Sequence, residues 1–363
     1  MNDAALLVLH DYFEAAEGGG RLCLILAKAL GADLGYGFRL PRHPFFEQPF
    51  PGREHDLGLR TDLPLWRQLR LARGFARDAG FARGYRTVVY SGFYAPLAVA
   101  NRPDHGNLYY CHTPPRFLYD QRDFYLDRLP LWQRPLLMTF CHYLRQRYEQ
   151  ALERMQVIVA NSETVRGRLK HYLGRDCFVV NPPCDTAAFN WRGQDGYYLS
   201  MARLDPLKRV DLVVRAFREM PDRRLIVASG GPELENIRRL AAGAANIRIL
   251  GWVSEAQLGE LLGRAIATVY VPRDEDFGMS PVESMAAGKP VIGVAEGGVR
   301  ETVLPGETGI LVRSNPDVAD ITAAVEELTP DRALAMRKAC EARARDFDTA
   351  VFLRGMRAVL ELA

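Results

Sequence analysis

The chain has 363 residues, of which 48% are hydrophobic and 25% are charged, and its formal net charge is +3. This length exceeds what a single hydrophobic core usually supports, so we expect two domains. The composition is typical of a globular protein and excludes a disordered or fibrous chain. A net charge so close to zero gives no reason to expect nucleic acid as a partner.

The cysteines and the apolar runs indicate in which cellular compartment the protein is expected. The six cysteines are scattered without any C-x-x-C pair, which favours a reducing environment over a disulfide framework or a zinc site. The apolar stretch at residues 6–9 is too short for a signal peptide and has no basic leader. No apolar run reaches transmembrane length. We therefore expect a cytoplasmic protein, with any membrane contact made peripherally on the cytoplasmic face of the inner membrane.

The first half of the chain alternates strand-like and helix-like segments. It opens with a predicted strand at residues 5–9, a glycine turn at residues 18–20 and a helix at residues 22–30. Further strands are predicted at residues 87–90, 107–111, 157–160 and 177–180, and a long helix at residues 132–154. Such alternation predicts a parallel sheet covered on both faces. The sequence Asn181-Pro182-Pro183 then marks a connector.

The same alternation restarts after the connector. Strands are predicted at residues 197–200, 224–229, 247–250, 267–271 and 290–294, and helices at residues 210–220, 254–263 and 280–287. The fold class is therefore α/β, with two Rossmann-like, doubly wound parallel-sheet domains in series. Ligands bind at the carboxyl ends of the strands in such sheets. The loops after residues 9, 110, 200, 229 and 271 are accordingly where the chemistry is expected.

The strongest motif is the segment PRDEDFGMSPVE at residues 272–283, which places Glu275 in a loop and Glu283 in the helix that follows. A carboxylate accepts two hydroxyl hydrogen bonds at once, as the grip on a ribose or a hexose diol requires. Phe277, Gly278 and Met279 precede that helix, whose exposed N–H groups and positive dipole end suit a phosphate or a sugar hydroxyl. This segment is therefore a candidate sugar and phosphate site.

The same segment contains Asp274-Glu275-Asp276, which spells D-x-D, a pattern that can hold a divalent cation through carboxylate oxygens. The two glutamates spaced by seven residues explain the same positions without a metal. We therefore expect neither a metal site nor a cofactor.

Two further loops carry candidate anion contacts. Arg203 and Lys208 follow the first strand of the second half, where two cations can neutralise a diphosphate and the charge that develops on it as a glycosidic bond breaks. Gly19 and Gly20 open the first helix and let the backbone approach an anion or an acceptor, although a glycine run is often only a tight turn.

A histidine and a serine are the remaining candidates for chemistry. His112 stands at the carboxyl end of a predicted strand and before two prolines, which favours a role in a site over a purely structural hydrogen bond. Ser162 lacks the flanking glycines of a hydrolase nucleophile, so we interpret it as a helix cap.

One segment is strongly basic. Residues 39–86 contain ten arginines against five acidic residues, and Arg67, Arg70, Arg73 and Arg77 recur there at helical spacing. Such a stripe can bind anionic lipid headgroups. An ordinary solvated helix face accounts for it equally well.

In order and spacing these motifs resemble the retaining glycosyltransferases of family four, which have the GT-B fold. The matching segments are GGGR at 18–21, CHTP at 111–114, NS at 161–162, Arg203 with Lys208, and Glu275 with Glu283. The resemblance covers nearly the whole chain. It implies an acceptor-binding domain at residues 1–182, a nucleotide-sugar-binding domain at residues 183–346, an interdomain cleft, and a final helix within residues 347–363 that crosses back to the first domain.

The resemblance also implies residue roles. Arg203 and Lys208 would bind the donor diphosphate, Glu283 the ribose and Glu275 the transferred sugar, while His112 would lie beside that sugar. The residues expected to contact the donor are Gly19, Gly20, Arg203, Lys208, Gly230, Val253, Glu275, Phe277, Gly278, Met279 and Glu283. Those expected to take part in catalysis are His112, Arg203, Lys208 and Glu275.

The stretch YCHTPPRFLYD at residues 110–120 looks most like the bacterial mannosyltransferases of surface-polysaccharide (O-antigen) synthesis. It implies transfer of mannose from GDP-mannose, with retention and without metal, to a saccharide or lipid-diphosphate-linked acceptor. The leaving diphosphate would take the acceptor proton in a front-face reaction. A UDP-sugar or GDP-deoxyhexose donor, a GT-B epimerase or hydrolase, and a non-catalytic subunit of a glycan assembly complex remain alternatives.

Overall fold

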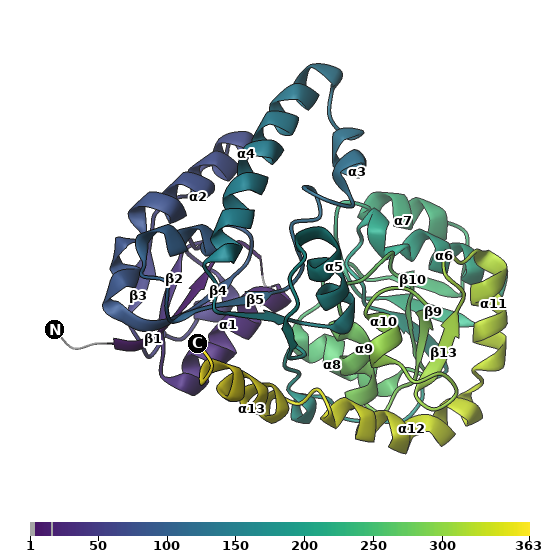
Figure 1. The fold of residues 1–363 in the computed structure, drawn as a ribbon. Coiled ribbons are helices and arrows are strands. Elements are labelled where there is room, and N and C mark those ends of the chain that lie inside the picture. The colour runs from purple at the N-terminus through teal and green to yellow at the C-terminus, as the bar shows by residue number, and fades with distance from the viewer. Residues whose placement is uncertain (1–3, 16) are drawn as a thin grey trace. The chain divides into compact units, whose positions relative to one another are not determined.

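The computed structural model describes residues 4–15 and 17–363 and divides the chain into two compact units (Figure 1). The first unit comprises Met1–Asn181 and Leu353–Ala363, and the second comprises Pro182–Phe352. The chain thus leaves the first unit between Asn181 and Pro182, within the predicted connector. It returns at Leu353, inside the last helix, so residues 347–352 belong to the second unit.

The first unit is built on a seven-stranded parallel sheet in the order β3-β2-β1-β4-β5-β6-β7. Its strands are β1 Ala4–His10, β2 Asp33–Tyr36, β3 Glu54–Asp56, β4 Tyr85–Ser91, β5 Asn107–Cys111, β6 Val157–Ala160 and β7 Phe178–Val179. Consecutive residues Leu7, Val8 and Leu9 of β1 are all fully buried. A strand buried on both faces is what a central position in a parallel sheet requires.

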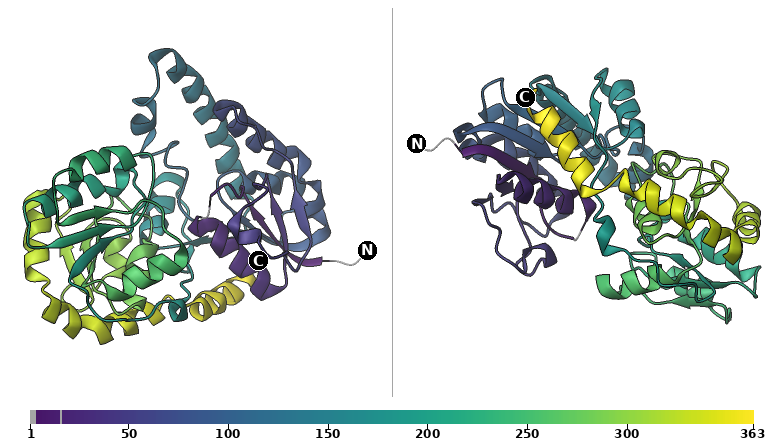
Figure 2. Two further views of the ribbon diagram at one scale, coloured as in Figure 1. Left: turned by 180° about the vertical axis from the view of Figure 1, so that it is seen from behind. Right: turned by 90° about the horizontal axis from the view of Figure 1, so that it is seen from below.

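Helices lie on both sides of this sheet (Figures 1 and 2). They are α1 Gly18–Leu30, α2 Pro64–Asp78, α3 Arg122–Leu126, α4 Arg134–Glu153, α5 Glu163–Leu173 and the later part of α13 Thr349–Leu360. Ser162 caps α5 because its Oγ accepts a hydrogen bond from the main-chain N–H of Val165 at 3.1 Å, which confirms the cap predicted there.

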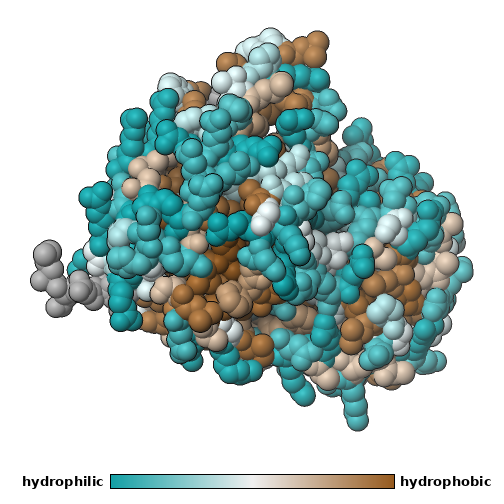
Figure 3. All heavy atoms as spheres, in the orientation of Figure 1, coloured by the Kyte–Doolittle hydropathy of each residue, from teal (hydrophilic) through white to brown (hydrophobic). Residues whose placement is uncertain are grey.

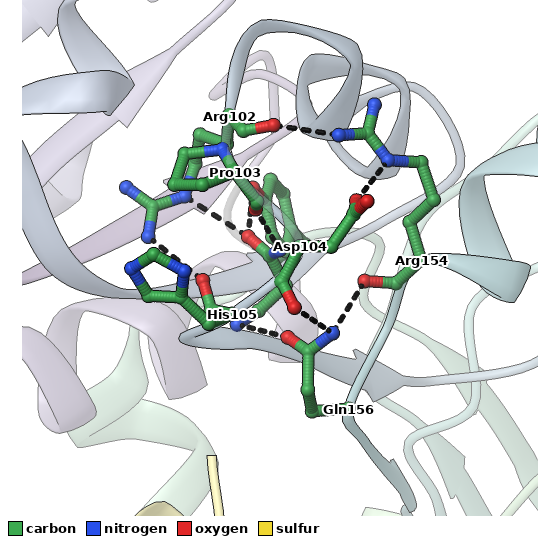
Figure 4. A network of polar contacts seen from close by, with 8 residues as sticks. Arg102, Pro103, Asp104, His105, Arg154 and Gln156 are labelled. Carbon is green, nitrogen blue, oxygen red and sulfur yellow. Dashed lines mark hydrogen bonds and ion pairs between the residues drawn. The ribbon is translucent and has the colours of Figure 1, made fainter.

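A buried arginine fastens the amino ends of the central strands (Figure 4). The guanidinium of Arg102 donates to Oδ1 of Asn107 at 2.9 Å and to four backbone carbonyls, including that of Tyr85 at 2.6 Å. Arg154 donates to the carbonyl of Arg102 at 2.6 Å, and the side chain of Gln156 accepts from the N–H of Asn107 at 2.9 Å. Because this network satisfies the buried charge with neutral acceptors at the amino ends of β4 and β5, its role is structural.

The second unit has a six-stranded parallel sheet in the order β10-β9-β8-β11-β12-β13. Its strands are β8 Tyr197–Ser200, β9 Arg224–Val227, β10 Ile247–Ile249, β11 Thr268–Tyr270, β12 Val291–Val294 and β13 Gly309–Val312. Its helices are α6 Val210–Arg218, α7 Leu234–Ala241, α8 Glu255–Arg264, α9 Met279–Ala286, α10 Val299–Thr302, α11 Val318–Glu327, α12 Pro330–Arg345 and the start of α13. Each unit has its own hydrophobic core.

Both sheets reverse their strand order at one point, between β1 and β4 in the first unit and between β8 and β11 in the second. In doubly wound sheets the loops on either side of such a point diverge and leave a crevice for ligands at the carboxyl ends of the strands. The α/β class with two Rossmann-like units is therefore confirmed, and the topology directs attention to the loops after these four strands.

The structure also contains elements that the sequence patterns did not indicate. Strands β2, with sequence DLGY, β3, with sequence EHD, and β13 were not predicted. Strands β2 and β3 carry polar residues or glycine in place of an apolar run, and β3 lies at the edge of its sheet.

Candidate functional site

The loop after β8 carries Arg203 and Lys208 in the second unit. It turns at a short 3₁₀ helix over Pro206–Lys208, which Asp205 caps by accepting a hydrogen bond from the N–H of Leu207 at 2.9 Å. Arg203 is exposed and Lys208 is half-buried at the end of this turn. The capped turn therefore fixes where the lysine side chain starts.

The loop between β11 and α9 carries the other charged candidates. Gly278 precedes α9 with a φ of 90°, a conformation that favours glycine, and the helix starts at Met279. Phe277 is buried and anchors the loop, whereas Glu275 and Glu283 are half-buried. This arrangement leaves both carboxylates with access to solvent near the start of the helix.

A main-chain hydrogen bond and an ion pair connect these two loops. The N–H of Arg273 donates to the carbonyl of Leu207 at 2.7 Å, and Lys208 Nζ forms an ion pair with Glu275 Oε2. The side chains of Lys208 and Glu275 remain 26% and 17% exposed. A cation and a carboxylate are thus held in contact at the point where the sheet reverses its order, and both can still reach a ligand.

Tyr270, the last residue of β11, was missed by sequence reasoning. Burial raises the pKa of its hydroxyl well above the usual range, and the nearby carboxylates of Glu275, Glu283 and Asp276 raise it further. Lys208 Nζ lies 5.9 Å from the centroid of its ring. The paired Lys208 and Glu275 therefore lie beside one neutral phenol, and the charge of Glu283 also acts on it. The only signal of Tyr270 in the sequence is that an aromatic residue ends a strand beside a charged loop.

Gly230 and Val253 lie on the neighbouring loops after β9 and β10. The carbonyl of Gly230 accepts a hydrogen bond from the N–H of Leu204 at 2.9 Å. A methyl group added at Gly230 would lie 2.4 Å from Nε1 of Trp252, whose indole is nevertheless 71% exposed. Trp252 therefore offers a large aromatic surface beside the loop of Arg203, and next to the half-buried Val253.

The first unit has its own cluster of polar side chains, at the ends of three adjacent strands. His10 ends β1, Ser91 ends β4 and His112 follows β5. Ser91 Oγ lies 2.7 Å from His112 Nε2 and 3.1 Å from His10 Nδ1. Burial lowers the pKa of His112 to about 4, and burial together with the neighbouring His112 lowers the pKa of His10 to about 3. Both imidazoles are therefore neutral at pH 7, and a single hydroxyl links them.

The glycines at the start of α1 pack against this cluster. A methyl group added at Gly19 would lie 3.3 Å from His112 Nε2, and one at Gly20 would lie 3.0 Å from the ring of Phe13. Glycine at these positions thus permits the close approach of α1 to the strand ends. Sequence reasoning found Gly19, Gly20 and His112 but not the linking residues His10 and Ser91.

The predicted site residues thus form two groups. Gly19, Gly20 and His112 are adjacent in the first unit, whereas the remaining candidates lie in the second. Within residues 4–15 and 17–363, no group of three or more His, Cys, Asp or Glu residues is arranged to hold a metal ion. All six cysteines are free. No helix in the described part of the chain combines the length and the apolar character needed to cross a bilayer.

Comparison with known families finds a match within the second unit. Residues 185–347 match the family model described as Glycosyl transferases group 1.

The chain is 29% identical over 235 residues to D-inositol 3-phosphate glycosyltransferase of Corynebacterium aurimucosum, covering 56% of each chain. It is 34% identical over 152 residues to the GDP-mannose-dependent alpha-(1-6)-phosphatidylinositol monomannoside mannosyltransferase of Mycolicibacterium smegmatis, covering 38% of this chain and 40% of that one. It is 27% identical over 267 residues to Alpha-1,3/1,6-mannosyltransferase ALG2 of Dictyostelium discoideum, covering 62% of each. The chain spans about half the length of the curated relatives it matches.

Solved structures share the fold over almost the whole chain. Sucrose-phosphate synthase from Thermosynechococcus elongatus has a TM-score of 0.79 at 17% identity and covers 99% of both chains. HepE of Anabaena, in complex with UDP and glucose, has a TM-score of 0.75 at 17% identity and covers 99% of this chain and 100% of its own. At such low identity the likeness establishes the fold, which is that of the GT-B glycosyltransferases.

Proposed function

Because residues 185–347 form a group 1 glycosyltransferase domain, we propose that the protein transfers a hexose from a nucleotide sugar to a saccharide or lipid-linked saccharide. The observation that carries this proposal is the contact between the two loops at the order reversal of the second sheet. There Lys208 is paired with Glu275 beside Tyr270, inside the matched domain, and the charge of Glu283 also acts on this tyrosine. A cation for a diphosphate and two carboxylates for sugar hydroxyls are the groups that a nucleotide-sugar donor requires.

Each donor residue has a role in this proposal. Arg203 and Lys208 bind the diphosphate, Glu275 contacts the transferred hexose and Glu283 holds the ribose. The main-chain N–H groups of residues 277–279 add contacts at the start of α9, where the helix dipole favours anionic groups. Trp252 is exposed beside Gly230 and offers an aromatic face to the nucleobase near Val253.

The proposed donor is GDP-mannose. Support comes from the relatives, two of which are named as mannosyltransferases and one of those as GDP-mannose-dependent. The HepE structure, which shares the fold, holds UDP and glucose, so a UDP-sugar is the alternative that a test must separate.

The proposed reaction retains the configuration of the anomeric carbon and needs no metal. The bond between the anomeric carbon and the donor phosphate oxygen breaks while the acceptor oxygen bonds to the same face of that carbon. The leaving phosphate oxygen takes the acceptor proton. Arg203 and Lys208 stabilise the negative charge that develops on the diphosphate. In this proposal Glu275 holds sugar hydroxyls and is not a nucleophile, because a front-face reaction forms no covalent bond between the protein and the sugar.

The proposed acceptor is a saccharide linked to a lipid diphosphate, at the cytoplasmic face of a bacterial inner membrane. A groove of about 580 Å³ beside α2 is lined by Trp66, Arg70, Arg73 and Arg77, among others. Arg67 is bound to Glu14 at 2.9 Å, whereas Arg73 and Arg77 are exposed and have no ion pair within the part of the chain that the structure describes. Arginines beside an exposed tryptophan suit anionic headgroups.

The tip formed by α3 and the start of α4 adds an apolar surface in the same unit. Leu131, Trp132, Leu136 and Met138 are all more than half exposed. Hydrophobic residues are visible at this tip in Figure 3. Exposed large apolar residues next to arginines are typical of surfaces that contact membrane.

The membrane contact is tested by sedimentation with liposomes that contain anionic lipid at low salt. We expect the wild type to sediment and the double variant Arg73→Ser/Arg77→Ser to sediment severalfold less, because each basic residue near an anionic surface contributes about 1 kcal/mol. The matched control, Arg215→Ser/Arg239→Ser, removes two exposed arginines of the second unit and should sediment like the wild type. If the wild-type protein stays in the supernatant, the proposed membrane contact is wrong, and the proposal for the donor site is not affected.

The donor site is tested by thermal unfolding without metal in the presence of GDP-mannose, GDP-fucose, UDP-glucose, UDP-N-acetylglucosamine and ADP-glucose. A donor that binds only the folded protein raises its melting temperature. We expect GDP-mannose to stabilise the wild type and the Glu307→Ala variant, and to stabilise Glu283→Ala little or not at all. Glu307 is exposed and lies in the turn before β13, at the opposite end of the sheet from the proposed site.

Each other outcome has a defined meaning. If only a UDP-sugar stabilises the protein, the proposed donor site stands but the donor is a UDP-sugar and not GDP-mannose. If the donor stabilises Glu283→Ala as much as the wild type, Glu283 does not bind the ribose. No stabilisation by any of the five donors favours a non-catalytic subunit over the proposed enzyme.

A further inference from the structure

One carboxylate in the second unit, that of Glu296, is bonded to three residues whose backbone has a positive φ. Among the described residues, the only ones other than glycine with a positive φ are Arg209 at 51°, Asp274 at 46° and Asn315 at 50°. All three are bonded to Glu296, which follows β12. Left-handed backbone is unfavourable for a residue with a side chain and persists where the surroundings impose it. Because all three left-handed residues are bonded to the same side chain, we look for the cause of this conformation in their contacts with Glu296.

The bonds to Glu296 come from three different loops. Arg209 Nη1 lies 2.9 Å from Glu296 Oε1, and their side chains are only 11% and 9% exposed. The N–H of Asp274 donates to Oε2 at 3.2 Å, and the N–H of Asn315 donates to Oε1 at 2.5 Å. Burial alone would raise the pKa of Glu296, but these hydrogen bonds outweigh it and lower the pKa, so the group stays ionised. A single carboxylate thus ties together the loops after β8, β11 and β13.

Two of these loops carry the proposed donor residues. Arg209 directly follows Lys208, and Asp274 directly precedes Glu275. The residues after Glu296 reinforce the same loop, because the N–H of Gly298 donates to the carbonyl of Glu275 at 2.8 Å. Glu296 is therefore bonded next to both members of the ion pair between Lys208 and Glu275.

Stability alone is a poor explanation for this arrangement. A glycine at position 209 would adopt the observed φ without strain. Burying an ion pair costs desolvation that roughly offsets its attraction. A strained arginine whose charge is buried against one carboxylate is better explained by the geometry that it imposes.

We propose that Arg209 and Glu296 are positioning residues that clamp the Lys208 loop and the Glu275 loop into the arrangement that binds the donor diphosphate and sugar. This inference rests on the proposed function of the same site. Neither residue contacts the donor in this account, and each acts through its neighbour in the chain.

The decisive variant is Arg209→Gly, because glycine accepts the left-handed backbone, so the arginine side chain is removed without adding backbone strain. The matched control is Asn315→Gly, which removes a side chain at the same φ but keeps the main-chain N–H that Glu296 accepts. Glu296→Gln is a second variant, which keeps the shape of the side chain and removes its charge. Donor affinity is measured by calorimetry with the nucleotide sugar that stabilises the wild type, and backbone hydrogen exchange is followed over residues 203–209 and 272–279.

We expect Arg209→Gly to bind the donor about tenfold more weakly, and also to melt below the wild type, because the Glu296 carboxylate then stays buried without its counter-charge. Its exchange should be faster in the two loops only. Glu296→Gln should weaken binding similarly, and Asn315→Gly should match the wild type in both measurements. A purely structural role would instead raise exchange throughout the unit and leave the donor affinity of the folded protein unchanged.

Wild-type affinity and unchanged loop exchange in Arg209→Gly would overturn the inference. If the wild type binds no nucleotide sugar, the proposed function fails, and the exchange measurement without ligand still decides whether the pair holds the two loops. The two failures are therefore distinguishable.

Discussion

Three adjacent strands of the first unit end in side chains that form one hydrogen-bonded chain, His10 to Ser91 to His112. The serine hydroxyl has a single proton, so when it donates to one imidazole it can only accept from the other. The states of the two histidines are thereby linked. Cys23 Sγ lies 3.5 Å from His10 Nδ1 at the buried end of this chain, and Gly19 packs against His112 at the other end. His112 is consequently oriented by its neighbours and kept neutral by burial.

The buried histidines predict how stability changes with pH. The pKa of His112 is about 4 in the folded protein against about 6.5 when unfolded, so the unfolded chain binds the proton first as the pH falls. The stabilisation is complete above pH 6.5 and is lost as the pH falls towards 4. By linkage, this one group should cost about 1 kcal/mol of unfolding free energy between pH 6.5 and 5.5.

Urea unfolding at several pH values measures this loss. The nearby Asp11 acts in the opposite direction, because burial raises its pKa to about 6, so the comparison must be made between variants. We expect the loss between pH 6.5 and 5.5 to be smaller in His112→Asn than in the wild type, and unchanged in His142→Asn, which removes an exposed histidine. Identical pH dependence in His112→Asn and the wild type would show that His112 titrates normally.

At the scale of elements, the second unit places two loops that contact each other at the point where its sheet reverses order. The main-chain contact between Arg273 and Leu207 and the turn at residues 296–298 fix the loop after β11. Gly297 has a φ of 52°, and a methyl group added there would lie 2.2 Å from the carbonyl oxygen of Glu275. Glycine at this position is therefore required by contact as well as by conformation.

This close contact predicts the effect of Gly297→Ala. We expect the substitution to lower the free energy of unfolding by about 3 kcal/mol, since it combines left-handed strain with overpacking, and to abolish stabilisation by the donor. Gly306→Ala is the matched control, because Gly306 has a φ of 80° and open space around it. It should cost only the backbone strain, about 1 kcal/mol, and keep the response to the donor. Equal losses in urea unfolding for the two variants would mean that the contact with Glu275 carries no energy.

The sequence was informative where local patterns decide structure. The strands at residues 107–111, 157–160 and 197–200 have the predicted bounds, because buried parallel strands are short continuous apolar runs bounded by turns. The polar edge strand β3 gave no such signal. The loops that bear Lys208 and Glu275 were predicted from their positions after strands. Tyr270 and Glu296 were not, because their importance depends on contacts with residues distant in sequence.

At the scale of the whole molecule, each unit is a complete doubly wound domain with its own core and its own polar site at the order reversal. The full-length likeness to sucrose-phosphate synthase and to HepE extends this architecture to proteins that are only 17% identical. Function is therefore argued from the sites, since the fold alone supports many donors and acceptors. The proposal for donor binding in the second unit rests on the match of residues 185–347 to Glycosyl transferases group 1, and the proposal for an anionic acceptor surface in the first rests on the basic groove beside α2.

The most direct test of the proposed enzyme is sugar transfer itself, measured with radiolabelled GDP-mannose, the purified protein and a bacterial lipid extract. We expect label in the organic phase only when protein and extract are both present, no dependence on added metal or chelator, and a loss of at least a hundredfold in Lys208→Ala, because its charge stabilises the leaving diphosphate. Donor cleavage at the same rate with and without the extract would instead indicate a hydrolase. Donor binding without any transfer or cleavage, across lipid and saccharide acceptors, would contradict the account of this protein as a glycosyltransferase.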